Sequence, residues 1–171
     1  LDTIVNAAQI VKDQQINWII IGDGRKKDWM EKKDISMKLN NQFKFLGSKP
    51  VKQIPKYFAV ADVLLVTLKN DPIFSHTIPG KIQSYLACGK PIIAAINGEG
   101  AKIINESDSG QAVSAEDHIN LARVIVKFSK MSKSELNLRG KKALEYYNNN
   151  FNRKLLIQKI ETIIRSQIKR N

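Results

Sequence analysis

Short, continuously apolar runs alternate with helix-like segments along this chain, and this alternation limits the possible folds more than any other feature. The runs WIII, VLLV and PIIAAI occupy residues 18–21, 63–66 and 91–96. Because they do not alternate between apolar and polar residues, they suit strands that are covered on both faces, as in a parallel sheet. Each run is followed by a segment typical of a helix, which is the order of βα units. We therefore predict an α/β fold with a Rossmann-like, doubly wound parallel sheet.

The length and composition of the chain fit one domain. A chain of 171 residues is long enough to bury roughly 70 % of the surface that its unfolded form exposes. Its hydrophobic content of 43 % and charged content of 26 % are ordinary for a globular domain. No apolar run approaches the roughly 18 residues that a membrane-spanning helix requires. The single cysteine, Cys88, has no disulfide partner and is predicted to be a small buried apolar residue.

Both ends of the sequence predict helices. The start, LDTIVNAAQIVKDQ, has no leading strand but has apolar residues at helical spacing, and we interpret the sequence as a piece of a longer protein. Residues 151–171 are predicted to form a closing helix with one apolar face. Residues 26–40 predict another helix, in which Trp29, Met30, Ile35 and Met37 are expected to be buried.

The chain is strongly basic, with a net charge of +12 and a pI near 9.8. This charge admits nucleic acid, an anionic membrane surface or a phosphorylated small molecule as a partner. From Lys130 onward there are eleven basic and three acidic residues. A solvated lysine-rich face and attraction to an anionic membrane both remain open for this segment. The lack of an aromatic-studded strand or a recognition helix argues against nucleic acid as a partner.

The loops at the carboxyl ends of the predicted strands hold the candidate site, because ligands of doubly wound sheets bind there. In GDGR, Gly22 and Gly24 permit a sharp turn, and Arg25 can reach a phosphate or a carboxylate. The dinucleotide fingerprint needs a third glycine that this loop lacks, which disfavours a nicotinamide site. A plain turn between a strand and a helix would explain the same glycines.

Two further loops precede predicted helices whose free amide groups could bind an anion. One helix is expected to open near Pro79, and Lys81 then lies in its first turn, where the helix dipole disfavours a cation unless an anion is nearby. The unfavourable position of Lys81 therefore indicates a binding role, and the alternative is that Lys81 is simply a solvated surface lysine. The loop NGEG at 97–100 precedes the other helix and offers amides of the same kind.

Metal binding and nucleophilic catalysis are not indicated. Neither His76 nor His118 has a second histidine, cysteine or carboxylate at ligand spacing, so we predict no metal and no cofactor. No serine lies in a nucleophile-elbow pattern. Taken alone, His76 is a loop histidine and His118 is a surface residue of a helix.

The order of these motifs resembles the carboxy-terminal, donor-binding domain of family-four retaining glycosyltransferases with the GT-B fold. The resemblance rests on segments 19–25, 43–68, 76–93, 97–110 and 146–151. The variant TIPGKIQSYLACGKPI particularly resembles bacterial fucosamine-transferase-like enzymes, which build O-antigen and capsule repeats. The resemblance implies that residues 1–171 are a single nucleotide-sugar-binding domain, that the amino-terminal acceptor domain is absent from this sequence, and that the fragment alone is inactive.

The resemblance also implies roles for individual residues. Family members carry two glutamates that contact the donor sugar and the ribose, and this sequence has His76 and Ser84 in their places. His76 would bind a sugar hydroxyl or a phosphate oxygen, and Ser84 would bind the ribose. Lys81 would grip the diphosphate, so His76 and Lys81 are the expected catalytic residues. The other expected substrate-binding residues are Gly22, Gly24, Arg25, Leu46, Gly47, Ser75, Thr77, Pro79, Gly80, Gly98, Glu99 and Gly100.

The function implied by the resemblance is sugar transfer. A hexosyl or N-acetylaminosugar group would pass from a nucleoside diphosphate sugar, with UDP as the expected carrier, to a lipid-linked or saccharide acceptor with retention of configuration. We expect a bacterial, cytoplasmic enzyme of lipopolysaccharide or capsule biosynthesis, with peripheral contact at the inner face of the cell membrane as an open question. The alternative is a noncatalytic nucleotide-binding α/β module.

Overall fold

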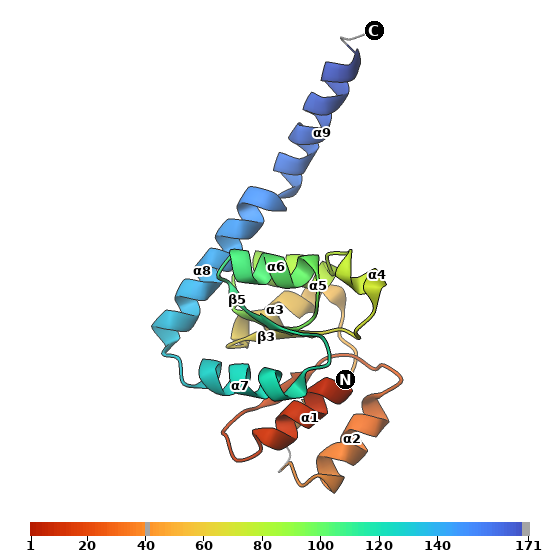
Figure 1. Ribbon diagram of the computed structural model, residues 1–171, viewed down its shortest axis with the longest axis vertical. Helices are drawn as coiled ribbons and strands as arrows, with labels where there is room; N and C mark the ends of the chain where they lie inside the picture. The colour runs from red at the N-terminus through yellow and green to blue at the C-terminus, as the bar shows by residue number, and fades with distance from the viewer. Residues whose placement is uncertain (40–41, 169–171) are drawn as a thin grey trace.

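The computed structural model describes residues 1–39 and 42–168, in which strands and helices alternate over most of the chain (Figure 1). The strands are β1 (Trp18–Ile20), β2 (Phe43–Phe45), β3 (Leu64–Thr67), β4 (Ile92–Ala95) and β5 (Gly110–Val113). The helices are α1 (Asp2–Ile10), α2 (Lys27–Ser36), α3 (Ile54–Val60), α4 (Pro72–Ser75), α5 (Gly80–Ala87), α6 (Glu99–Glu106), α7 (His118–Ser129), α8 (Lys133–Asn150) and α9 (Arg153–Ile168), with a 3-10 turn η1 (Val51–Gln53). The predicted α/β class is confirmed.

In the described residues the strands form two parallel sheets. One sheet pairs β1 with β2 and sets Trp18 opposite Phe43. The other has the order β3-β4-β5 and sets Val66 opposite Ala94. The three continuously apolar runs of the sequence supply β1, β3 and β4. Parallel neighbours need a crossover connection, and helices supply it here, as in doubly wound folds.

Strand β4 is buried on both faces. Ile93 and Ala95 belong to a cluster with α1 and α7, whereas Ile92 and Ala94 belong to a second cluster with α5, α6 and α8. Each isoleucine contributes about 1.5–3 kcal/mol by leaving water. The helices therefore form a layer on each side of this sheet, as the uninterrupted apolar sequence of β4 predicts.

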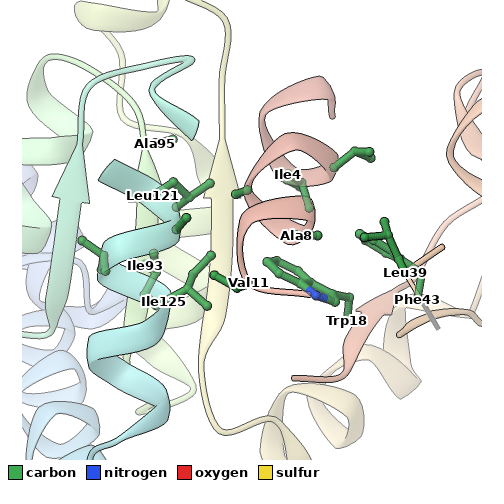
Figure 2. Packing of buried hydrophobic residues seen from close by; sticks show 14 of the residues in the cluster. Ile4, Ala8, Val11, Trp18, Leu39, Phe43, Ile93, Ala95, Leu121 and Ile125 are labelled. Carbon is green, nitrogen blue, oxygen red and sulfur yellow. The ribbon is translucent and has the colours of Figure 1, made fainter. Parts of the chain in front are cut away.

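The first cluster joins the two sheets into one core. Its buried residues include Ala8 of α1, Val11 at the end of that helix, Trp18 of β1 and Leu121 of α7 (Figure 2). The ring of Trp18 stacks on that of Phe43 with 5.5 Å between the centroids. Side chains thus connect the sheets, although no strand ladder joins them within residues 1–39 and 42–168.

Besides its apolar packing, helix α8 makes two specific contacts with the domain. A Cβ on Gly140 would lie 2.2 Å from the carbonyl oxygen of Gly89, so a larger residue would push α8 away from the end of α5. Asp108 accepts from Lys142 Nζ at 2.5 Å and from Arg139 Nη1 at 2.7 Å. These hydrogen bonds lower the pKa of Asp108, and the one from Lys142 has the larger effect. Two basic residues of the carboxy-terminal segment therefore have partners within the domain.

Helix α9 extends away from the sheets, so the predicted closing helix is present but its apolar face stays exposed (Figure 1). The exposed apolar side chains are Leu156, Ile157, Ile160, Ile163 and Ile164. The last residues of the predicted helix, 169–171, lie outside the described residues. None of the described helices is both long enough and apolar enough to cross a membrane.

Met30 is buried as predicted, and Trp29 and Met37 are partly buried against the core. The predictions for Ile35 and Cys88 are wrong. The side chain of Ile35 is 75 % exposed, because Met30 and Asp34 form the buried side of α2. Cys88 is half-buried at the end of α5, where partial burial raises the pKa of its thiol.

Asp34 leads to a prediction about pH and stability. Its side chain is buried, its Oδ1 has no hydrogen-bond partner among the described residues, and burial raises its pKa. A raised pKa in the folded state means that the charged form costs stability, and this cost appears as the pH rises through the folded pKa. Asp34→Asn should therefore raise the free energy of unfolding by about 1 kcal/mol near neutral pH and much less in acid.

Urea unfolding of Asp34→Asn and of the unaltered protein, near neutral pH and in acid, measures this difference. Asp13→Asn is the control, because Asp13 is exposed. An equal effect of Asp34→Asn at both pH values would contradict the assignment of a charge cost to Asp34.

Candidate functional site

Two glycines join the loops that follow β1 and β2. The N–H of Gly22 donates to the carbonyl oxygen of Gly47 at 2.9 Å, and Leu46 donates to Ile20 at the same distance. Gly22 has a φ of 137° and Gly47 a φ of 66°, both in the region that favours glycine. The structure therefore brings Gly22, Leu46 and Gly47 together at the carboxyl edge of this sheet.

Arg25 lies on the exposed surface of the same edge. The carbonyl oxygen of Gly24 accepts from Lys27, and a Cβ on Gly24 would meet nothing within 4 Å. Lys26 is paired with Asp2, with 2.5 Å between Nζ and Oδ2. Arg25 makes no ion pair in the described part of the chain, so its guanidinium is available to an anion.

The loop after β3 folds back onto the start of α6. Asp71 caps the short helix α4 by accepting from the Ile73 N–H at 2.9 Å, and Thr77 Oγ1 donates to the Ile73 carbonyl at 3.3 Å. A Cβ on Gly98 would lie 1.9 Å from the carbonyl oxygen of Ser75. Since Gly98 also has a φ of 74°, only glycine suits this close approach.

Helices α5 and α6 begin side by side. Pro79 is the N-cap of α5 and Gly98 is the N-cap of α6. Gly100 is buried between them, since an added Cβ would lie 2.8 Å from Ile82 Cδ1 and 3.2 Å from Pro79 Cδ. Both helices therefore present the positive ends of their dipoles to one region of the surface.

The polar groups of α5 and the preceding loop differ in whether they form hydrogen bonds within the domain. The backbone N–H groups of Gly80 and Lys81 have no acceptor among the described residues, and the Lys81 side chain is exposed. His76 is exposed at the carboxyl end of α4. Ser84 Oγ donates to the Gly80 carbonyl at 3.0 Å, so its proton is used within the helix while its lone pairs can still accept.

Two asparagines that the sequence analysis did not select connect three strand-end loops. Asn97, after β4, donates from Nδ2 to Asn70 Oδ1 at 2.9 Å. Its own Oδ1 accepts from the Ala115 N–H at 3.0 Å. One side chain thus ties the loops after β3, β4 and β5. Its position directly after an apolar strand is the signal that could have identified Asn97.

The predicted residues therefore form two groups rather than one. The first lies on the β1–β2 sheet and the second on the β3–β4–β5 sheet, and no hydrogen bond or ion pair of the described residues connects them. The first group is Gly22, Gly24, Arg25, Leu46 and Gly47. The second group is Ser75, His76, Thr77, Pro79, Gly80, Lys81, Ser84, Gly98, Glu99 and Gly100.

An open cavity lies beside the second group. It has a volume of about 400 Å³, and its lining includes Asn97, Gly98, Asp117 and Asn120. Glu99 is exposed in the first turn of α6, where the dipole favours a carboxylate. Within residues 1–39 and 42–168, no three His, Cys, Asp or Glu side chains are close enough to hold a metal ion.

Residues 1–145 match the model of the family described as glycosyl transferases group 1. The chain belongs to this family. The matched residues include both groups of site residues.

Similar proteins agree with this assignment. The probable glycosyltransferase WbjE of Pseudomonas aeruginosa is 29 % identical over 138 residues, which are 80 % of this chain and 34 % of WbjE. A glycosyltransferase of Rickettsia africae superposes with a TM-score of 0.81 at 20 % identity, over 99 % of this chain and 44 % of that one. HepE of Anabaena, solved with UDP and glucose, superposes with a TM-score of 0.77 at 20 % identity, over 96 % of this chain and 44 % of HepE.

These structural likenesses show the fold, which is that of GT-B glycosyltransferases, and confirm the fold prediction. The group 1 domain spans about a third of WbjE and less than half of the solved relatives.

The contact of Gly98 with Ser75 predicts a large effect of a single methyl group. Gly98→Ala should lower the free energy of unfolding by about 2 kcal/mol or more, because the added Cβ overlaps backbone and the residue has a positive φ. Urea unfolding measures the change. The matched control is Gly80→Ala, whose Cβ would meet nothing within 4 Å. Equal stability of the two variants would contradict the close approach.

Proposed function

We propose that this glycosyltransferase domain binds a nucleoside diphosphate sugar, and that the longer enzyme transfers the sugar to a lipid-linked or saccharide acceptor. The convergence of the first turns of α5 and α6, held by the approach of Gly98 to Ser75 and of Gly100 to Pro79, carries the proposal. Free amides at helix N-termini attract phosphate groups. Structures of HepE with UDP and with UDP-glucose support UDP as the carrier.

Lys81 stabilises the leaving group in this proposal. When the bond between the sugar and the diphosphate breaks, its electron pair remains on the β-phosphate oxygen as negative charge. The ammonium of Lys81 and the N–H groups of Gly80 and Lys81 interact most strongly with that developing charge, so they lower the barrier. The negative charge of a bound diphosphate also offsets the unfavourable interaction between the Lys81 ammonium and the dipole of α5.

The rest of the donor contacts the surrounding loops. His76 binds a sugar hydroxyl or a phosphate oxygen, and Ser84 accepts a hydrogen bond from a ribose hydroxyl, because its own proton is engaged by Gly80. Other groups of this loop and of the α6 start line the same region: Ser75, Thr77, Pro79, Gly98, Glu99 and Gly100.

The β1–β2 edge binds the nucleoside end of the donor. The backbone at Leu46 and Gly47 faces the base, and the adjoining turn at Gly22 and Gly24 lines the same cleft. Arg25 supports this role because its exposed guanidinium can approach an anionic part of the donor.

We assign the longer enzyme to retaining transfer of an N-acetylaminosugar or hexosyl group in bacterial surface polysaccharide synthesis, at the cytoplasmic side of the membrane. The pattern TIPGKIQSYLACGKPI, similar to that of aminodeoxysugar transferases, supports this class. The related WaaG, described as involved in lipopolysaccharide biosynthesis, is consistent with it. Because the acceptor would bind to another domain, residues 1–171 alone would not transfer sugar.

Lys81 gives the sharpest test of the mechanism. In the longer enzyme, Lys81→Ala should lower kcat more than tenfold at saturating donor, because the interaction develops in the transition state. Lys81→Arg should restore part of the rate. The control is Lys141→Ala, an exposed lysine of α8. Unchanged turnover of Lys81→Ala would remove Lys81 from the mechanism.

Calorimetry tests the class of ligand. Titration of residues 1–171 with UDP, UDP-N-acetylhexosamines, GDP-sugars and an oligonucleotide should show preferential binding of the UDP compounds. Binding of UDP together with an inactive full-length enzyme would favour the noncatalytic nucleotide-binding module. Exclusive binding of the oligonucleotide would contradict the donor site.

Helix α9 motivates a proposal of membrane contact. The helix has an exposed apolar face and also carries the exposed basic residues Lys154, Lys159 and Arg165. Each basic residue near an anionic surface contributes on the order of 1 kcal/mol. We expect the chain to co-sediment with vesicles containing anionic lipid at low salt and to be released at high salt. Equal binding to neutral vesicles, or no binding to either, would contradict this contact.

A further inference from the structure

The loop that carries His76 has few contacts with the rest of the domain. In residues 69–78, which join β3 to the start of α5, every side chain except that of Ser75 is exposed. The side-chain hydrogen bonds of Asp71 and Thr77 both stay inside the loop. Segments with few buried contacts open easily, so the position of this loop depends on the small number of contacts that hold it.

One hydrogen bond connects this loop to another part of the domain. Asn97 Nδ2 donates to Asn70 Oδ1 at 2.9 Å, and no other hydrogen bond of the described residues joins residues 69–78 to the remainder of the domain. Packing adds the close approach of Ser75 to Gly98. Both contacts end on the two residues that precede α6, so the loop is held at one place.

The backbone fixes the orientation of the Asn97 side chain. The N–H of Ala115 can only donate, so the side-chain oxygen of Asn97 must face it, at 3.0 Å. The NH2 group of Asn97 is thereby turned toward Asn70. Asn97 is half-buried, whereas Asn70 is exposed and its amide can turn to present either its oxygen or its nitrogen. Asn97 is therefore the fixed partner of this amide pair, and Asn70 is the adaptable one.

We propose that Asn97 is a positioning residue, which holds the loop of residues 69–78 through Asn70 so that His76 meets the donor. The inference rests on the proposed function, in which His76 binds a sugar hydroxyl or a phosphate oxygen. A loop that leaves its binding position lowers the fraction of molecules that are ready to bind, and the Kd of the donor rises in proportion.

Lys81 does not depend on the amide pair. It belongs to α5, which is held in the core by the buried side chains of Ile82 and Leu86. Loss of the amide pair should therefore raise the Kd and the KM of the donor, while kcat at saturating donor stays close to its original value. This separates the positioning role from that of Lys81, whose loss lowers kcat.

Two substitutions of Asn70 in the longer enzyme test the proposal by calorimetry with UDP-N-acetylglucosamine. Asn70→Ala removes the acceptor and should raise the Kd about fivefold, because one hydrogen bond of the loop is lost. Asn70→Asp keeps an acceptor oxygen for Asn97 and should bind nearly as well as the unaltered enzyme, although it adds a negative charge. A general effect of charge predicts the reverse order of the two variants.

A double substitution isolates the contact between the two side chains. Asn97→Asp alone keeps the bond from Ala115, and Asn70 can turn its NH2 group toward the new carboxylate. When Asn97→Asp is combined with Asn70→Asp, two carboxylates face each other. The Kd of this double variant should exceed the product of the two single effects by about fivefold, because side chains in contact are not additive.

Hydrogen exchange of residues 69–78, measured by mass spectrometry without ligand, provides the second readout. Exchange should be faster in Asn70→Ala and unchanged in Asn70→Asp. Equal exchange in the two variants, unaltered donor binding in Asn70→Ala, or a kcat that falls as in Lys81→Ala would each overturn the positioning role alone. An unaltered enzyme that binds no UDP compound would contradict the proposed function, and the positioning role with it.

Discussion

The burial of β4 on both faces is the constraint on which the rest of the domain depends. Ile92 and Ala94 hold α5, α6 and α8 on one side, and Ile93 and Ala95 hold α1 and α7 on the other. Because β3, β4 and β5 are parallel neighbours, the loops that follow them emerge at one edge of the sheet. Asn97, after β4, then ties these loops together.

The arrangement of the candidate site follows from close backbone contacts. Glycine at position 98 lets the loop after β3 contact the start of α6, and glycine at position 100 lets α5 and α6 pack at their first turns. The two first turns present free backbone amides and the exposed side chain of Lys81 to one region of the surface.

Much of the fold could be predicted from the sequence because its causes are local. Three continuous apolar runs predict β1, β3 and β4, and the turn around Gly22 is predicted by its glycines. The burial of Ile35 was predicted wrongly because helical spacing does not reveal which side of α2 faces the core. The division of the site into two groups could not be predicted, because it depends on how the sheets pair and not on the motifs themselves. Asn70 and Asn97 were missed because each acts through a partner distant in sequence.

The most direct test of the donor site is a crystal structure of the full-length protein with a UDP-sugar. We predict that the diphosphate accepts hydrogen bonds of about 3 Å from the N–H groups of Gly80 and Lys81, with the base beside Gly47. A nucleotide bound instead in the cavity beside Asp117 and Asn120, with the first turn of α5 unoccupied, would contradict it.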